Sequence, residues 1–94
     1  MRIGEVIGRV TLSRCHPDIR GAVWKLVVPL DRQGLQGEAS GRGEPMIVYD
    51  EIGSGIGSNI AISDGAEASA PFFPAVKPID AYCAALLDEI RIPQ

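Results

Sequence analysis

The residues that could act as nucleophiles or general bases are few in this chain, and they do not form a catalytic set. His16 is the only histidine, and the proline that follows it favours an extended loop with a solvated side chain. Three serines near the middle of the chain are candidate nucleophiles: Ser54, Ser58 and Ser63. A serine becomes a strong nucleophile only beside a base, and His16 belongs to a distant loop. The sequence therefore indicates no nucleophilic catalysis.

Metal ligation and acid–base catalysis have no better support. Zinc sites combine several His or Cys ligands at set spacing, whereas Cys15 and Cys83 stand far apart and outside any CxxC motif. Cys83 lies in an apolar segment, where we expect a small buried hydrophobe. The carboxylates show no pair in opposed environments, and we expect them, Asp50 and Glu51 included, at turns and on a solvated surface. We therefore predict no metal, no cofactor and no enzymatic activity.

The glycine-rich corner at residues 53–57, G-S-G-I-G, is the remaining candidate for chemistry. A dinucleotide-binding loop needs G-x-G-x-x-G before a helix N-terminus. Here Asn59 and Ile60 stand where the third glycine should fall, no helical pattern follows, and there is no G-K-[ST] motif. Nucleotide binding is therefore not favoured. Three glycines at one corner suggest instead that something large approaches bare backbone there, either a ligand or another chain.

The segments that would position this corner show the patterns of β-strands. Four such segments are residues 2–13, 22–30, 46–49 and 59–62. A fifth, residues 79–90, is ambiguous, because its alanine and leucine content favours helix while its length and position suit a closing strand. The connector at residues 66–77 can begin with one helical turn, but its prolines forbid a long helix. The predicted fold is mainly β, a small five-stranded, OB-like, partly open barrel with a short helical connector.

Single residues within these segments refine the expectation. Gly4 and Gly8 interrupt the first strand and suit a strongly curved barrel strand. Trp24 is expected to pack as a large apolar side chain rather than to serve as a binding platform. Residues 31–44 are polar and rich in glycine, so we expect a flexible hairpin connection that is longer than usual.

Composition excludes several classes of protein. At 94 residues the chain is one domain, and its net charge of −3 with only 5% aromatic residues disfavours a role in binding nucleic acid. No signal peptide and no apolar run long enough to cross a membrane are visible. We therefore expect a cytosolic protein with two reduced thiols, without nucleic-acid or membrane partners.

Taken together, these motifs resemble the EutN/CcmL family, the pentameric vertex proteins of bacterial microcompartment shells. The opening MRIGEVIGRVTLSRCHPDIRG and the later WKLVVPLD match its first strands. Asp50 followed by IGSGIG matches the D-x-V-G-A-G-x-G pattern, and part of the G-S-A-A-R element is present at residues 65–68. The segment PIDA at residues 78–81, with an apolar run to Asp88, matches the family's closing element. Ser54 replaces the usual alanine, and Ser69 replaces the usual arginine.

The resemblance implies a structural role for the chain. Five copies would form a closed ring, a homopentamer, that caps a vertex of a cytoplasmic shell otherwise tiled by hexameric microcompartment shell proteins. It also implies that residues 79–90 form the last barrel strand. The predicted subunit contact, or region near the five-fold axis, is Gly53, Ser54, Gly55, Ile56 and Gly57. The alternative is a small OB-like module that binds a small ligand or single-stranded nucleic acid, although its aromatic residues form no evident stripe.

Overall fold

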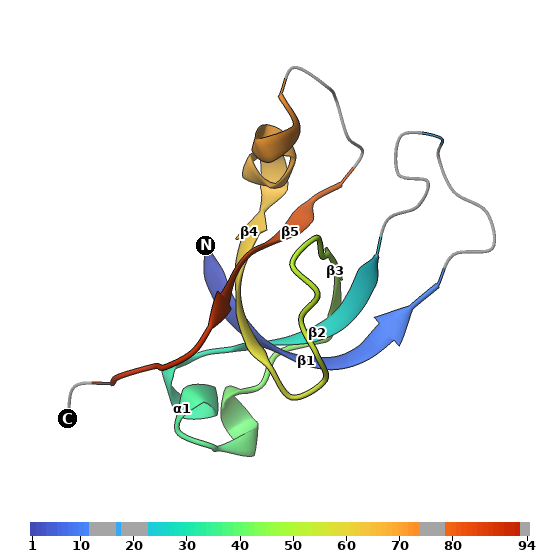
Figure 1. Cartoon of the computed structure of the whole chain (residues 1–94). Helices are drawn as coiled ribbons and strands as arrows, with labels where there is room; N and C mark the ends of the chain where they lie inside the picture. The colour runs from blue at the N-terminus through green and yellow to red at the C-terminus, as the bar shows by residue number, and fades with distance from the viewer. Residues whose placement is uncertain (12–16, 18–22, 74–78, 93–94) are drawn as a thin grey trace.

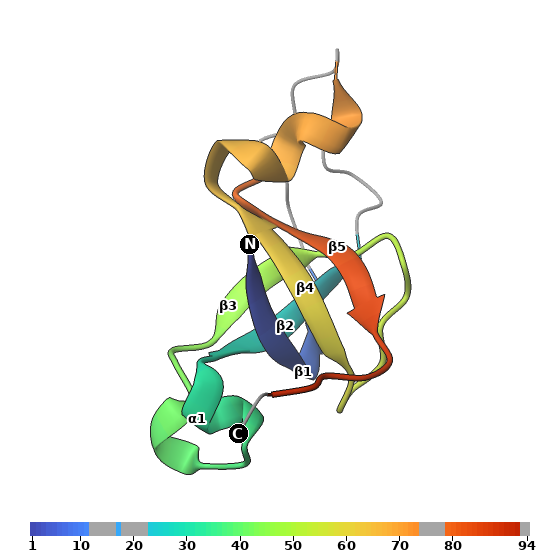
Figure 2. The same cartoon turned by 90° about the vertical axis from the view of Figure 1, so that its left-hand side faces the viewer.

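The computed structural model of the chain describes residues 1–11, 17, 23–73 and 79–92 (Figure 1). Within them the elements follow one another as β1 (Arg2–Val10), β2 (Trp24–Leu30), α1 (Arg32–Leu35), η2 (Ala39–Gly41), β3 (Met46–Tyr49), β4 (Asn59–Asp64), η3 (Gly65–Phe72) and β5 (Ala81–Leu87). The two η elements are short 3-10 helices. Figure 2 shows η3 at one end of the barrel and α1 at the opposite end. The predicted mainly β, five-stranded fold is confirmed.

The five strands form one closed barrel in the order β1-β2-β3-β5-β4, with β4 returning to pair with β1. All neighbouring strands are antiparallel except β3 and β5, which pair in parallel through Tyr49 and Tyr82. The prediction of a partly open barrel was wrong on this point, because this short parallel contact closes the sheet. The last segment is a strand, as the family resemblance implied and its helix propensity opposed. Six register pairs with β4 outweigh that propensity.

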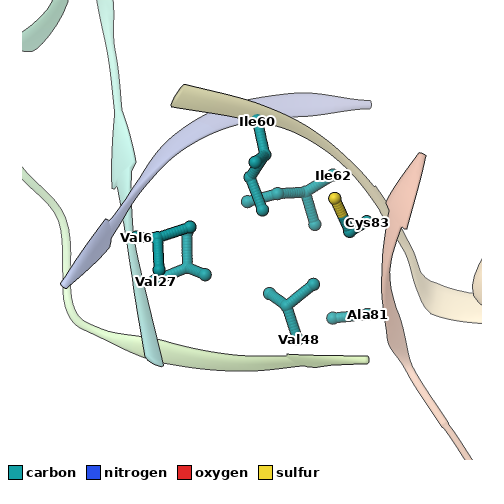
Figure 3. Packing of buried hydrophobic residues seen from close by; sticks show 7 residues of the cluster. All are labelled: Val6, Val27, Val48, Ile60, Ile62, Ala81 and Cys83. Atoms are coloured by element: carbon teal, nitrogen blue, oxygen red, sulfur yellow. The ribbon is translucent and has the colours of Figure 1, made fainter. Parts of the chain in front are cut away.

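The core fills the inside of the barrel with small and β-branched side chains from all five strands (Figure 3). The central cluster consists of Val6, Val27, Val48, Ile60, Ile62, Ala81 and Cys83. Cys83 is fully buried, as predicted. The central cluster contains no aromatic residue. Trp24 is only 8% exposed and packs edge-on against Tyr49, with ring centroids 5.3 Å apart. The prediction that Trp24 serves packing is confirmed.

The first strand bends where the sequence placed its glycines. Its register shifts between Val6 and Gly8, so the strand bulges at Ile7 and turns around the barrel. Gly4 faces the core, where a Cβ atom would lie 2.5 Å from Cγ1 of Val27 and 2.9 Å from Cδ1 of Ile62. The strand ends at Val10, before the predicted end at Ser13, which lies outside the described residues.

The glycine-rich connection after β2 is folded, so the prediction of a flexible hairpin was wrong. Asp31 caps α1 by accepting a hydrogen bond from the Gly34 amide at 3.0 Å. Gly34 and Gly41 then let α1 and η2 cross at backbone distance, because a Cβ atom on Gly34 would lie 2.3 Å from the Gly41 carbonyl oxygen. The glycines permit a close crossing, and the crossing orders the segment.

The connector before β5 also holds more helix than predicted. A single turn was expected at its start, yet η3 runs for eight residues and includes Pro71. Pro71 has no N–H group, so it donates no backbone hydrogen bond within this helix. The prolines at positions 74 and 78 lie outside the described residues.

Replacing Gly4 by alanine should destabilise the barrel by about 1–3 kcal/mol, because the added methyl group overpacks the core. The matched control is Gly8→Ala, whose Cβ would lie 3.6 Å from the nearest atom, Cβ of Leu26, an ordinary contact. Thermal unfolding at one fixed protein concentration measures both variants. Equal midpoints for the two variants would contradict the assignment of Gly4 to the packed core.

Candidate functional site

The glycine-rich corner is a loop of residues 50–58 that joins β3 to β4. Both of its ends are hydrogen-bonded to the barrel. At its start the Asp50 amide donates to the Val23 carbonyl at 2.8 Å. At its end the Gly57 amide donates to the Val6 carbonyl at 2.8 Å, and the Val6 amide donates back to the Ser58 carbonyl at 2.9 Å. The loop is therefore fixed at both ends on the strands that frame the core.

The middle of the loop is organised by one buried carboxylate, that of Asp50. Its Oδ1 accepts hydrogen bonds from the amides of Ile52 at 2.9 Å and Gly53 at 3.1 Å. Its Oδ2 accepts from both the amide and the hydroxyl of Ser54, each at 2.8 Å. Asp50 is only 2% exposed, so the prediction that it sits on a solvated surface was wrong. Four donors replace the water that the carboxylate loses on burial.

A lysine from β2 completes this arrangement from inside the barrel. The Lys25 ammonium lies 3.6 Å from Asp50 Oδ2 and also donates a hydrogen bond to the Ser54 carbonyl oxygen. Burial alone would raise the pKa of Asp50. The hydrogen bonds from the Ser54 hydroxyl and from the three backbone amides outweigh that effect, so the pKa lies below its ordinary value of 3.8. The carboxylate is therefore ionised at neutral pH.

The five residues predicted as the subunit contact divide between the two sides of this loop. Ser54 is 1% exposed, and its hydroxyl is used within the chain by Asp50. The other four lie on the exposed side: Gly53, Gly55, Ile56 and Gly57. Gly53 and Gly57 adopt positive φ values of 88° and 91°, which side chains rarely tolerate. Gly55 does not, and a Cβ atom there would meet only Ser58 Oγ, at 3.9 Å.

Nothing in the described part of the chain therefore requires a glycine at position 55. Its backbone conformation is open to other residues, and space for a side chain is free. Next to it, Ile56 is 76% exposed, and Ile52 is exposed as well. Ile7, at the β1 bulge, adds a third exposed isoleucine beside the strand segment that holds the loop end. Two exposed isoleucines thus flank the bare backbone of Gly55 within the loop, and a third follows Val6, which is hydrogen-bonded to the loop end.

Sequence reasoning missed the two residues that organise the loop, Asp50 and Lys25. One local signal was present, because an aspartate just before a turn often accepts hydrogen bonds from backbone amides that follow it. For Lys25 the signal was its alternation with Val27 on the strand face that points inward. Neither pattern predicts that these two residues, 25 positions apart in the sequence, form an ion pair.

The other reactive groups of the described residues serve packing. Burial, reinforced by the nearby charge of Asp50, raises the pKa of the Cys83 thiol to about 11, so the thiol stays neutral at physiological pH. A hydrogen bond to Glu51 at 2.7 Å, helped by burial, raises the pKa of Tyr82 to about 12. No group of three or more potential metal ligands occurs among the described residues. Cys15 and His16 lie outside them.

The described residues offer little support for the alternative function, a module that binds a small ligand or single-stranded nucleic acid. The barrel brings four rings together, but they pack on one another edge-to-face or stacked and offer no open platform: Trp24, Tyr49, Phe72 and Tyr82. A groove of about 640 Å³ does lie between the barrel and α1. Two of its polar side chains are already used within the chain, since Arg2 pairs with Asp64 at 2.9 Å and Asp31 caps α1. Within the described part of the chain, no helix has the length and apolar character needed to cross a membrane.

Replacing Asp50 by asparagine should make stability less dependent on pH in acid. A lowered pKa means that the ionised carboxylate stabilises the fold above pH 3.8 and that this contribution is lost as the pH falls through the lower pKa of the folded state. The variant should be less stable at pH 7, with a shallower loss of unfolding free energy below about pH 4. Urea unfolding between pH 2 and 7 measures this. Parallel pH profiles for the two proteins would contradict the role assigned to Asp50.

Comparison with known proteins places this geometry in context. Residues 1–88 match the sequence profile of the family described as "Ethanolamine utilisation protein EutN/carboxysome". A comparison with curated proteins gives no significant match. Among solved structures, the chain is similar to the GrpN pentameric microcompartment shell protein from Rhodospirillum rubrum, with 24% identity, a TM-score of 0.82 and coverage of 99% of this chain and 100% of that one.

Two further solved structures are similar over nearly the whole chain. One is the pentameric shell protein MSM0273 from the RMM microcompartment, with 29% identity, a TM-score of 0.74 and coverage of 93% of this chain and 100% of that one. The other is CcmL from Nostoc sp. PCC 7120, with 26% identity, a TM-score of 0.81 and coverage of 96% and 92%. With the family profile matching residues 1–88, the chain belongs to the EutN/CcmL family.

Proposed function

We propose that this chain is a structural protein that forms a homopentamer and caps the vertices of a bacterial microcompartment shell in the cytoplasm. Family membership over residues 1–88 supports this role. So does the likeness to the MSM0273 pentameric shell protein, which is matched along its whole length at 29% identity. The expected partners are four further copies of the chain and the hexameric shell proteins that tile the facets.

The observation that carries the proposal is the exposed, internally fixed loop of residues 50–58. A cyclic ring is built from heterologous contacts, in which one surface of a copy meets a different surface of the next. A surface that is already ordered binds a neighbour without the entropy cost of ordering it first. The Asp50 carboxylate supplies that order from inside, while Gly55 and Ile56 present backbone and an apolar side chain outside. The five predicted contact residues retain this role in the proposal, with Ser54 acting from the inner side.

The proposal includes no catalysis. Among the described residues the nucleophilic and acidic groups are buried, paired or scattered. The Cys83 thiol is held neutral, and the Asp50 carboxylate is enclosed by four donors. This arrangement suits a protein whose function is to keep a fixed shape.

Replacing Gly55 by valine should weaken ring formation by about tenfold or more while leaving the barrel folded, because the added side chain points into space that only a neighbour would occupy. Sedimentation velocity over a range of concentrations measures the assembly. Near-ultraviolet circular dichroism of the cluster around Trp24 and Tyr49 reports the fold. An intact five-copy ring at wild-type concentrations would contradict the assigned contact.

The matched control is Gly57→Ala in the same loop. Its φ of 91° makes a side chain there unfavourable by about 1–2 kcal/mol within the single chain. At protein concentrations below those at which the wild-type ring forms, this variant should therefore lower the unfolding temperature, whereas Gly55→Val should not. If both variants lowered it equally, the effect of Gly55→Val would come from the fold and not from a contact between copies.

The vertex role is tested by assembly with hexameric shell proteins in the same cell. Electron microscopy should show closed polyhedral shells with the wild-type chain, and open or elongated assemblies when the chain is omitted or carries Gly55→Val. Closed shells of equal number and shape in all three cases would exclude a role in capping vertices.

A further inference from the structure

We infer that Lys25, which lies on the inward face of β2, is a positioning residue for the contact between copies: its ammonium fixes the shape of the loop of residues 50–58 that a second copy meets. The inference rests on the proposed function and adds a residue that lies outside the exposed contact itself. Lys25 would act on the buried side of this loop, while the second copy would bind the exposed side.

The position of Lys25 is unusual for a charged residue. It alternates with Val27 on β2, and it pairs in register with Val48 of β3. Both valines belong to the core cluster. The Lys25 side chain is only 13% exposed. An apolar residue at this position would extend the core without the cost of removing a charge from water.

The contacts of Lys25 show what the charge does instead. Its ammonium donates to the Ser54 carbonyl oxygen at the centre of the loop and lies 3.6 Å from Asp50 Oδ2. Among the residues that the structure describes, it is the one side chain from outside the loop that hydrogen-bonds to residues 52–56. The loop is therefore held to the barrel at its two ends, through the Glu51 side chain, which accepts a hydrogen bond from Tyr82 of β5, and at this central carbonyl.

The central attachment matters because the outer side of the loop is glycine-rich. Glycine loses more backbone freedom on ordering than any other residue, and Gly53, Gly55 and Gly57 alternate along the exposed side. Without the ammonium, the Ser54 carbonyl loses the one hydrogen-bond donor that the described residues offer it, and the loop can sample other shapes. A second copy would then have to pay for ordering the loop on docking, which weakens the contact.

The direct test is Lys25→Met, which keeps a long unbranched side chain and removes the ammonium. The barrel should remain folded by near-ultraviolet circular dichroism, and the amides of Ile52, Gly53 and Ser54 should exchange hydrogen faster. The concentration at which half of the rings dissociate should rise about tenfold or more. Unchanged assembly in a folded Lys25→Met protein would overturn the inference.

Two matched controls separate positioning from general effects. Val27→Ala, two positions along the same strand face, should lower the unfolding temperature by creating a cavity but leave assembly unchanged. Arg42→Met removes an equal charge from an exposed pair with Glu5, in which the charged atoms lie 2.7 Å apart, and should also leave assembly unchanged. If either control weakened the ring as much as Lys25→Met does, the effect would reflect stability or net charge, and the inference would fail.

A second variant covers the case in which Lys25→Met does not fold because Asp50 is left unpaired. Lys25→Met combined with Asp50→Leu removes both charges of the buried pair, a type of change that is often neutral for stability. A ring that persists in this double variant overturns the inference. It is also overturned if Asp50→Leu alone weakens the ring as much as the double variant does, because the ammonium then adds nothing; a ring that only the double variant loses supports it.

Hydrogen exchange needs no change at position 25. In the Gly55→Val protein, the amides of Ile52, Gly53 and Ser54 should be as well protected as in the wild-type ring. Protection that appears only in the ring would mean that the neighbour orders the loop, which also overturns the inference. If Gly55→Val and Lys25→Met both leave the ring intact, the contact proposed for the loop is wrong. If Lys25→Met leaves the ring intact and Gly55→Val does not, the contact at the loop is supported and only the positioning role of Lys25 is wrong.

Discussion

The buried carboxylate of Asp50 is the interaction on which the glycine corner depends. A charge in the interior is unfavourable unless donors surround it. Here three backbone amides and one hydroxyl do so, and the Lys25 ammonium lies 3.6 Å away as the opposite charge. The same bonds force residues 52–54 to wrap around the carboxylate, which turns the outer side of the loop toward solvent. Local order at this corner thus follows from satisfying one buried charge, and no packing of large side chains is required.

The glycines of the chain act through different physical causes. Gly4 leaves room for the core, and Gly34 lets two short helices cross at backbone distance. Gly53 and Gly57 supply positive φ values where the loop reverses. Gly55 meets none of these needs among the residues that the structure describes. That contrast is the reason for assigning the free surface at Gly55 to a neighbouring copy.

Much of the fold could be predicted because local sequence patterns indicate its strands. Alternating side chains marked four strands, and the core position of Gly4 agrees with the curved strand expected there. The alanine and leucine content of the fifth strand favours helix, so predicting this strand required the family resemblance. The strand is stabilised by pairing with β4, which is distant in the sequence. The order of residues 31–44 was missed because it comes from a crossing of Gly34 and Gly41. At the site, the glycines of the corner could be read from the sequence, and their contact with another copy stays a prediction, whereas the pair of Asp50 and Lys25 is joined only by the fold.

The central claim is that this ordered, bare loop exists so that identical copies close into a ring of five. Native mass spectrometry of the purified wild-type chain at micromolar concentration tests it most directly. The account predicts one dominant species at five times the chain mass of 10.0 kDa. A dominant species at the mass of a single chain, or at any other multiple of it, would contradict the account.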